Sequence, residues 1–364
     1  MRRVVIAPDK FKGSASAHEV ANAVARGIAS ISPGSDLVAR PMADGGDGTV
    51  ELFLDSGARE CTAIVHDPLG RQITAKFALD GERAIVELAS ASGLVLETPR
   101  ERDPWRADSR GTGELIRAAL DAGAKAIVIG IGGSANNDAG IGLLRALGAT
   151  TQPIDALHGI ESIDLSGLDT RLAKTHLLVA SDVDNPLCGP NGASAIFGPQ
   201  KGAKPQDIPK LDAALAQTAD AMARALGRDV RDVPGAGAAG GVGFALLALG
   251  AQLRPGVDIV AELCGLPQAL SGASLCVTGE GSIDGQTLRG KTVFGVARYA
   301  AQANVPVIAL GGRIDTSVEA ALAAHGIVCE PVVTEPMPLE DAMRNAVALI
   351  EAAAARIART LSLD

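Results

Sequence analysis

Short apolar runs that end in glycine or aspartate, each followed by a helical pattern, limit the fold of this chain more than any other feature. Residues 3–7 are apolar and lead into Pro8 and Asp9, so we expect a buried strand there. We expect Ser14 to cap a helix that runs to about residue 30, and a second strand at 36–42 followed by a helix to about Asp55. A strand–helix–strand–helix order is typical of a parallel sheet.

The same alternation returns at the other end of the chain. The patterns predict strands at 274–278, 305–310 and 327–333, and helices at about 291–303, 316–324 and 338–361. The segment between the two ends carries its own expected strands, at 61–65, 72–79, 83–88, 126–131 and 176–181, and helices, at 112–122, 138–147, 206–227 and 240–250. The predicted fold is therefore α/β with two α/β domains. Residues 1–65 and 270–364 form the first, a parallel sheet built from both chain ends, and residues 66–269 form the second, inserted into it.

Composition excludes several classes of protein. The formal net charge is −9 and only eight residues are aromatic (Trp 1, Tyr 1, Phe 6), which argues against a nucleic-acid surface or an anionic-membrane surface. The uncharged run Val233–Leu253 contains six glycines, so we expect a glycine loop and a short buried helix rather than a membrane span. The five cysteines form no CxxC pair and the first residues do not resemble a signal peptide, which predicts reduced thiols and a cytoplasmic location.

Two kinds of nucleotide-binding motif occur in contexts that do not suit them. Residues 285–292 match the P-loop pattern, but the expected strand ends near Thr278, too early for a P-loop. Residues 235–240 and 130–135 match the dinucleotide pattern, but neither is followed at the required distance by an acidic residue ending a strand. Both glycine loops can still present backbone N–H groups to a phosphate.

Asp182 and Asp184 follow an expected strand, as in the D-x-D start of aspartyl phosphohydrolases. Pro186 stands where those enzymes carry Thr or Val, which argues against that class. Two carboxylates at a strand end also suit Mg²⁺, which favours one or two carboxylates together with phosphate oxygens.

Glycine, aspartate and basic residues follow most of the expected strands, and ligands of parallel sheets bind at the carboxyl ends of the strands. A cleft between the two domains would then hold phosphate-binding loops, carboxylates and cations. This set of groups is what phosphoryl transfer requires, so the residues by themselves favour a kinase or phosphotransferase.

Long, co-linear motifs then point to one family. They are Ala7–Ser14, Met42–Thr49, Gly111–Ile116, Gly132–Asp138, Asp182–Pro190, Phe197–Ala203, Gly235–Gly241 and Thr278–Gly281. Over nearly its whole length the chain resembles the type I bacterial glycerate kinases. The resemblance implies a two-domain α/β fold unrelated to P-loop kinases, with ATP, Mg²⁺ and D-glycerate bound and 2-phosphoglycerate as the usual product. At position 47 the family often carries Glu where this chain has Asp47.

We expect direct in-line transfer of the γ-phosphoryl group. The expected site residues are Asp44 and Asp47 for catalysis; Lys12, Arg110 and Lys291 for the substrate or the phosphoryl group; Gly132, Gly133, Ser134, Gly279, Glu280 and Gly281 for nucleotide phosphates; and Asp182 and Asp184 for the metal ion.

Three other functions stay open at this point. They are a kinase for another small hydroxy acid, a phosphohydrolase that uses Asp182, and a sensor that binds its ligand without turnover. The sequence does not determine which hydroxyl of glycerate reacts, nor the oligomeric state, for which a homodimer is one candidate.

Overall fold

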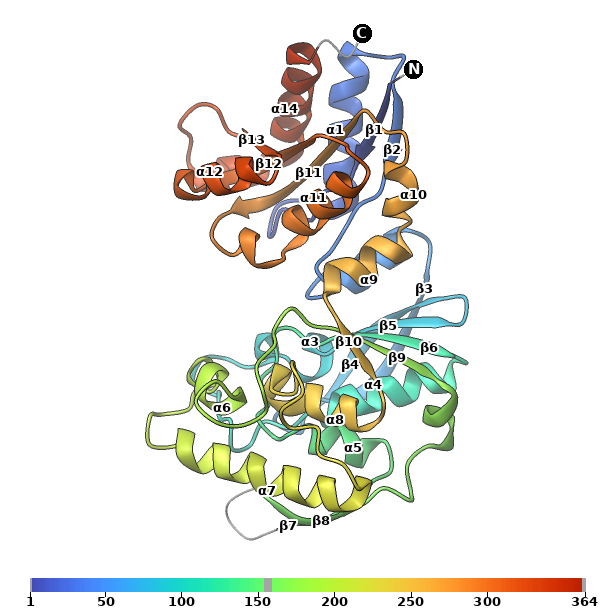
Figure 1. Cartoon of the computed structure of the whole chain (residues 1–364), viewed down its shortest axis with the longest axis vertical. Helices are drawn as coiled ribbons and strands as arrows, with labels where there is room; N and C mark the ends of the chain where they lie inside the picture. The colour runs from blue at the N-terminus through green and yellow to red at the C-terminus, as the bar shows by residue number, and fades with distance from the viewer. Residues whose placement is uncertain (1, 154–158, 362–364) are drawn as a thin grey trace. The chain divides into compact units, whose positions relative to one another are not determined.

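The contacts within the computed structural model, which describes residues 2–153 and 159–361, divide the chain into two compact units (Figure 1). Unit 1 comprises Met1–Asp44 and Val257–Asp364, and unit 2 comprises Gly45–Gly256. The predicted fold class is confirmed, because one parallel sheet is built from both chain ends and a second sheet lies in the inserted part. The units change at residues 45 and 257, whereas the sequence pattern placed the boundaries after residues 65 and 269.

The sheet of unit 1 has five parallel strands in the order β13-β12-β11-β1-β2. Its strands are β1 (Arg3–Ile6), β2 (Asp36–Ala39), β11 (Leu275–Ile283), β12 (Val307–Ile314) and β13 (Ile327–Pro331). β1 pairs with β11 on one side and with β2 on the other, so that Val5 faces Cys276 across one pair and Val38 across the other. The N-terminal strand therefore lies inside a sheet that the C-terminal strands extend.

The helices of unit 1 are α1 (Ala17–Ile31), α9 (Gly256–Leu263), α10 (Leu266–Leu270), α11 (Thr292–Gln302), α12 (Thr316–Ala324), α13 (Leu339–Arg344) and α14 (Ala346–Thr360). α1 and α14 pack together, and a Cβ at Gly27 would lie 2.2 Å from the Glu351 carbonyl oxygen, so glycine permits this close approach. Ser16 caps α1 in a capping box with Glu19, so the prediction that Ser14 is the cap is wrong. The predicted helix at 338–361 is broken into α13 and α14 at Asn345.

The main sheet of unit 2 has six strands in the order β10-β9-β6-β5-β4-β3. They are β3 (Arg59–His66), β4 (Gln72–Asp80), β5 (Arg83–Glu87), β6 (Ala126–Gly130), β9 (His176–Ala180) and β10 (Gln252–Arg254). The pairs among β3, β4 and β5 are antiparallel, whereas β5, β6, β9 and β10 run parallel. The four parallel strands therefore place the residues that follow them at one edge of this sheet.

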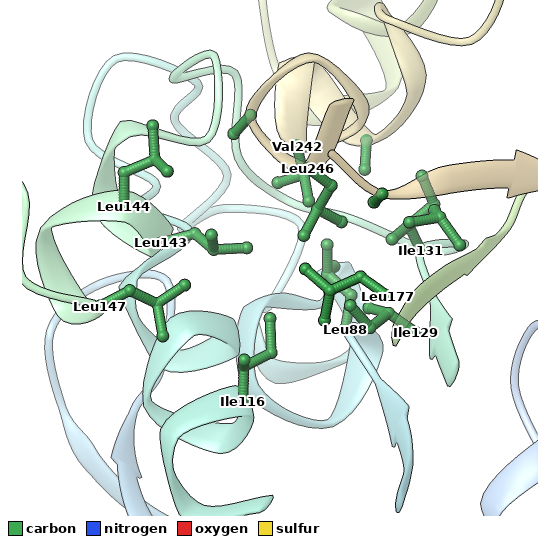
Figure 2. Close-up of a cluster of buried hydrophobic side chains, with 14 of the residues drawn as sticks. Leu88, Ile116, Ile129, Ile131, Leu143, Leu144, Leu147, Leu177, Val242 and Leu246 are labelled. Atoms are coloured by element: carbon green, nitrogen blue, oxygen red, sulfur yellow. The ribbon is translucent and has the colours of Figure 1, made fainter. Parts of the chain in front are cut away.

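The helices of unit 2 are α2 (Thr49–Asp55), α3 (Ala89–Ser92), α4 (Arg110–Asp121), α5 (Ile141–Ala146), α6 (Ala193–Phe197), α7 (Ile208–Leu226) and α8 (Val242–Ala248). Figure 2 shows how apolar side chains from α4, α5, α8 and the strands converge, among them Ile116, Leu143, Leu246 and Ile129. α4 packs closely on α5, since a Cβ at Gly113 would lie 2.4 Å from the Leu143 carbonyl oxygen. One apolar core thus joins these helices to the strands of the sheet.

Some elements did not stand out in the sequence. These are β10, α9, α10 and a separate antiparallel pair, β7 (Thr150–Pro153) with β8 (Ile160–Asp164). The glycine-rich run Val233–Leu253 holds the short buried helix α8, as predicted. Among the described helices, none combines the length and the apolar character needed to cross a membrane.

Candidate active site

Asp9 stands at the carboxyl end of β1 in unit 1, and sequence reasoning did not single it out as a site residue. Its backbone N–H donates to the Gly279 carbonyl oxygen (2.9 Å). One carboxylate oxygen accepts from the Lys10 N–H (2.7 Å), and the other accepts from the Thr292 hydroxyl. Burial, and then the negative charge of Asp44, raise the pKa of Asp9 to about 6. This carboxyl group therefore titrates close to neutral pH, where a general base works best.

Glu280 belongs to a strand and not to the loop that the sequence predicted. β11 continues through Gly279 and Gly281 to Ile283, and Glu280 pairs in register with Gly311 of β12. The prediction of a phosphate-binding loop at 279–281 is therefore wrong as secondary structure. β11 continues because β12 also runs on past its expected end at residue 310. The β12 residues from Gly311 to Ile314 are extended and pair with the last residues of β11.

The Glu280 side chain is only 7% exposed, and its Oε1 accepts a hydrogen bond from the Thr287 hydroxyl (2.6 Å). Burial raises the pKa of Glu280 to about 7, and the charge of Lys291 opposes that rise without cancelling it. Lys291 stands at the N-cap position of α11, and its charge acts on Glu280, so the structure does bring the two residues into one neighbourhood.

The strand before the P-loop-like segment 285–292 is longer than the sequence predicted. The preceding strand ends at Ile283, not near Thr278, so this segment does join a strand to a helix. Within it, Thr287–Arg289 form a 3-10 helix and Thr287 is bonded to Glu280. Thr292, at the hydroxyl position of the motif, donates to the Asp9 carboxylate. These hydrogen bonds use the motif's hydroxyl groups within the protein, which supports the rejection on different grounds.

Lys12 lies in the turn after β1, where Phe11 and Ala15 form an isolated bridge. Its side chain is exposed, and its backbone nitrogen would lie 3.4 Å from a Cβ at Gly281. The structure therefore places Lys12 beside the carboxyl half of β11.

In unit 2, the loop that contains Asp47 lies on the ends of the parallel strands. A Cβ at Gly45 would lie 2.4 Å from the Ala180 Cβ, and one at Gly130 would lie 2.1 Å from the Gly45 carbonyl oxygen. Asp47 itself is exposed and precedes Gly48, whose φ of 95° starts α2. Glycine is needed at 130 because the Gly45 carbonyl oxygen contacts the end of β6, and at 45 because its φ is positive (81°) and the Ala180 Cβ lies close.

The glycine loop after β6 lies beside this Asp47 loop, since a Cβ at Gly132 would be 3.8 Å from the Gly46 Cα. Gly132 and Gly133 are exposed, whereas Ser134 is buried. A hydrogen bond from the Leu94 N–H to the Gly133 carbonyl oxygen (2.9 Å) fixes the loop. Two accessible glycines over a buried anchor are suited to phosphate oxygens, which backbone N–H groups bind well.

Asp182 and Asp184 follow β9 and are both exposed. The Asp182 Oδ1 accepts from the Gly256 N–H (3.1 Å), and Gly256 also packs against Gly45. Asp47, Gly132 and Asp182 therefore lie along the same sheet edge. Among the described residues no group of three His, Cys, Asp or Glu side chains is arranged to hold a metal ion. A pair of exposed carboxylates fits Mg²⁺, which takes few protein ligands and keeps water or phosphate oxygens for the rest.

Arg110 is the first residue of α4, and its Nε donates to Glu114 Oε1 (2.8 Å). Glu114 in turn bonds His66 through its ring Nδ1 (3.0 Å) and its backbone N–H (2.7 Å). This predicted substrate ligand is thus part of an ion-paired cluster on α4 and β3.

Asp138 organises the loop between β6 and α5, and sequence reasoning had named it only as part of a motif. Its two carboxylate oxygens accept from the Ser109 hydroxyl and N–H, the Asn136 amide, and the N–H groups of Gly140 and Gly142, at 2.7–3.1 Å. Asp108 lies next to it, and burial, followed by the charge of Asp138, raises the pKa of Asp108 to about 6.

A cavity of about 300 Å³ opens beside this loop in unit 2. The polar residues Asp108 and Asn137 line it together with Trp105 and with Leu211 and Leu215 of α7.

Comparison with known proteins identifies the family to which this two-domain α/β chain belongs. The sequence matches the glycerate kinase family over residues 4–362. It is 46% identical to a glycerate kinase of Bacillus subtilis (99% of this chain, 98% of that protein) and 45% identical to a glycerate 2-kinase of Escherichia coli (99% and 98%). The fold matches a crystal structure assigned as glycerate kinase 2 from Salmonella typhimurium LT2 with a TM-score of 0.90 at 46% identity, covering 99% of this chain and 98% of that chain. The chain belongs to the glycerate kinase family, as its motifs predicted, and is an enzyme of that family.

Proposed function

We propose that this protein transfers the γ-phosphoryl group of ATP to the 2-hydroxyl of D-glycerate, with Mg²⁺ as cofactor, and so forms 2-phosphoglycerate. The observation that carries the proposal is the match to named glycerate kinases along the whole chain, one of them a glycerate 2-kinase. The gathering of Asp47, Gly132 and Asp182 at one sheet edge supports it, because phosphates, a metal ion and a proton acceptor are needed together.

In this proposal the residues of unit 2 bind the nucleotide phosphates. The N–H groups of the exposed residues Gly132 and Gly133 hold phosphate oxygens, and Asp182 and Asp184 hold Mg²⁺. Bound Mg²⁺ would neutralise charge on the phosphate oxygens. Lys12, Arg110 and Lys291 supply positive charge to the glycerate carboxylate or to the transferred group.

A carboxylate must accept the proton of the attacking hydroxyl, and such help is worth about 10²–10⁴-fold in rate. Asp44 and Asp47 are the proposed acceptors, as the sequence suggested. Asp9 joins them as a third candidate, because its pKa lies at about 6 and Asp44 is close enough to raise it. Glu280, with a pKa of about 7, suits proton exchange better than phosphate binding, so we reassign it from the phosphate-binding group.

The substrate is tested by ADP release measured with D-glycerate, tartronate, lactate and glycerol, each with and without Mg²⁺. We expect turnover only with D-glycerate and Mg²⁺ together, and the phosphorus NMR signal of the product should be a doublet from the single proton at the 2-position. Faster turnover of another acceptor would overturn the substrate, and a triplet would place the phosphate on the 3-hydroxyl. Phosphate released from a phosphoacid without ATP would point to a hydrolase that uses Asp182.

The acceptor of the proton is tested by Asp9→Asn, Asp44→Asn and Asp47→Asn, with Asp55→Asn at the end of α2 as the matched control. At least one of the first three should lose about 10²-fold in kcat, which is about 2.7 kcal/mol of transition-state stabilisation. The control should keep its kcat. If all three variants retain their rate, none of these carboxylates is the acceptor.

The five cysteines are all free, which supports the proposed cytoplasmic location.

A further inference from the structure

Lys201 is a lysine whose whole side chain is buried in unit 2. It ends the 3-10 helix Pro199–Lys201 and is 1% exposed. Its Nζ donates to the Ser134 Oγ (2.8 Å) and to the Asn136 carbonyl oxygen (2.6 Å). The ammonium group therefore ties the glycine loop after β6 to a segment 65 to 67 residues further along the chain.

The positive charge of Lys201 has no directly paired carboxylate among the described residues. Asp138 and Glu97 are the acidic groups that act on it electrostatically, and Arg102 lies on the chain segment that packs against Gly202. The oxygens of Asp138 are occupied by the hydrogen bonds given above. Glu97 is buried, its pKa is raised mainly by that burial, and neither of its carboxylate oxygens has a hydrogen-bond partner.

Burial of an ammonium group is costly unless something balances its charge. That cost is visible as a pKa of Lys201 lowered to about 7 by burial. Gly132 and Gly133, which precede Ser134 in the same loop, are exposed. An anion bound by their N–H groups would lie on the loop that the Lys201 ammonium group contacts through Ser134 and Asn136.

Residues 136–139 of this loop contact a second glycine-rich segment, residues 235–241, and both segments contain strained backbone. Ala139 and Ala239 both have positive φ angles (56° and 53°), which alanine rarely adopts. The Ala139 N–H donates to the Gly240 carbonyl oxygen (3.0 Å), and the Asn136 amide donates to that of Ala239 (3.0 Å). Strain of this kind persists only where surrounding contacts fix the backbone, and it concentrates at functional sites.

We propose that Lys201 is a positioning residue for the nucleotide phosphates. It acts through its hydrogen bonds to Ser134 and Asn136, which fix the loop. It also supplies a buried positive charge, which a phosphate bound to Gly132 and Gly133 balances. This inference rests on the proposed binding of ATP phosphates by that loop. It assigns to the Phe197–Ala203 motif a role that its sequence does not reveal.

The test uses the full-length protein and the variant Lys201→Met, which keeps the length of the side chain and removes its charge. Binding of ATP, ADP, AMP and adenosine is measured by calorimetry, beside the KM for D-glycerate. We expect affinity to fall by about tenfold or more for ATP, less for ADP and AMP, and not at all for adenosine, since a tenfold change is about 1.4 kcal/mol. The KM for D-glycerate should stay within about twofold. Lys204→Met, at an exposed lysine of the same segment, is the matched control and should bind all four compounds like the wild type.

An equal loss of affinity for all four compounds would overturn the proposal, because it would show a general structural role. Wild-type protein that binds none of the phosphorylated compounds would instead refute the proposed function itself. If Lys201→Met does not fold, Ser134→Ala and Lys201→Gln decide the question. Ser134→Ala should weaken ATP binding by about threefold and leave the affinity for adenosine unchanged. In a Lys201→Gln background the same substitution should weaken ATP binding no further, because the effects of residues that act through one contact are not additive. Full additivity would contradict the proposal.

Discussion

Glu280→Gln should make unit 1 more stable above neutral pH. The variant keeps an oxygen that can accept from the Thr287 hydroxyl, so the hydrogen bond at 2.6 Å can persist while the ionisable group is lost. The wild-type side chain is 7% exposed, and burial raises its pKa from the model-compound value of 4.5 to about 7. A carboxyl group with a raised pKa in the folded state stabilises the protein most below its unfolded pKa. That stabilisation is lost as the pH rises through the folded pKa.

The magnitude follows from these pKa values. Between about pH 5.5 and the folded pKa lie about 1.5 pH units, and each unit is worth about 1.4 kcal/mol. The wild type should therefore lose about 2 kcal/mol of unfolding free energy, relative to Glu280→Gln, when the pH is raised from about 5.5 to about 8.5. At pH 5.5 the difference between the two proteins should be smaller by that amount, because the carboxyl group of the folded protein is then mostly protonated.

The assay is urea unfolding followed by far-UV circular dichroism at the two pH values. Trp105 is the single tryptophan and lies in unit 2, so its fluorescence separately reports on that unit and should give the same midpoint in both proteins. Glu335→Gln, at an exposed loop position of unit 1, is the control and should show no pH-dependent difference. Equal pH dependence of the wild type and Glu280→Gln would refute the reasoning, since it would mean that Glu280 is ionised at pH 5.5.

Three further outcomes are expected. Lys291→Ala should lower kcat/KM for ATP by less than about tenfold, unlike loss of a P-loop lysine. It should also raise the pKa of Glu280 further, because the charge of Lys291 keeps that pKa down; steady-state kinetics over a pH series measures both effects. Gly142→Ala should destabilise unit 2 by about 1–3 kcal/mol in urea unfolding, because its Cβ would lie 1.5 Å from the Asp108 Oδ1, whereas Gly34→Ala, with open space around it, should cost far less. Iodoacetamide at about pH 8 should leave Cys276 unmodified in the folded protein, as mass spectrometry of peptides would show, because burial raises the pKa of its thiol to about 12.

The order of strands and helices could be predicted from the sequence because it depends on local pattern. Apolar runs of strand length, separated by helical periodicity, required parallel sheets, and the recurrence of that pattern at both ends required the ends to share one sheet. Since residues after parallel strands meet at one edge, the sequence also indicated that Gly132 and Asp182 would lie near one another. It assigned Asp47 to the other domain, so the place of the Asp47 loop beside Gly132 was not predicted. The motifs predicted the family, and the comparisons confirm that prediction.

Short elements and element ends were predicted less well, because neighbours in space decide them. β10 has three residues and pairs only because β9 lies beside it. β11 continues past Gly279 because β12 offers hydrogen-bond partners as far as Ile314. Ser16 caps α1 in preference to Ser14, since Glu19 stands where it completes the capping box.

The sequence by itself determined the α/β order of both units and the parallel sheet that the chain ends share, because each follows from periodicity and from the handedness of strand connections. Only the tertiary structure decided which polar groups are buried and what they touch. Asp9 meets Thr292 and Lys201 meets Ser134 across long separations in sequence, so no local pattern could reveal either contact. The physical reason is that a carboxyl or ammonium group takes its pKa from the atoms packed around it, and those atoms come from distant parts of the chain.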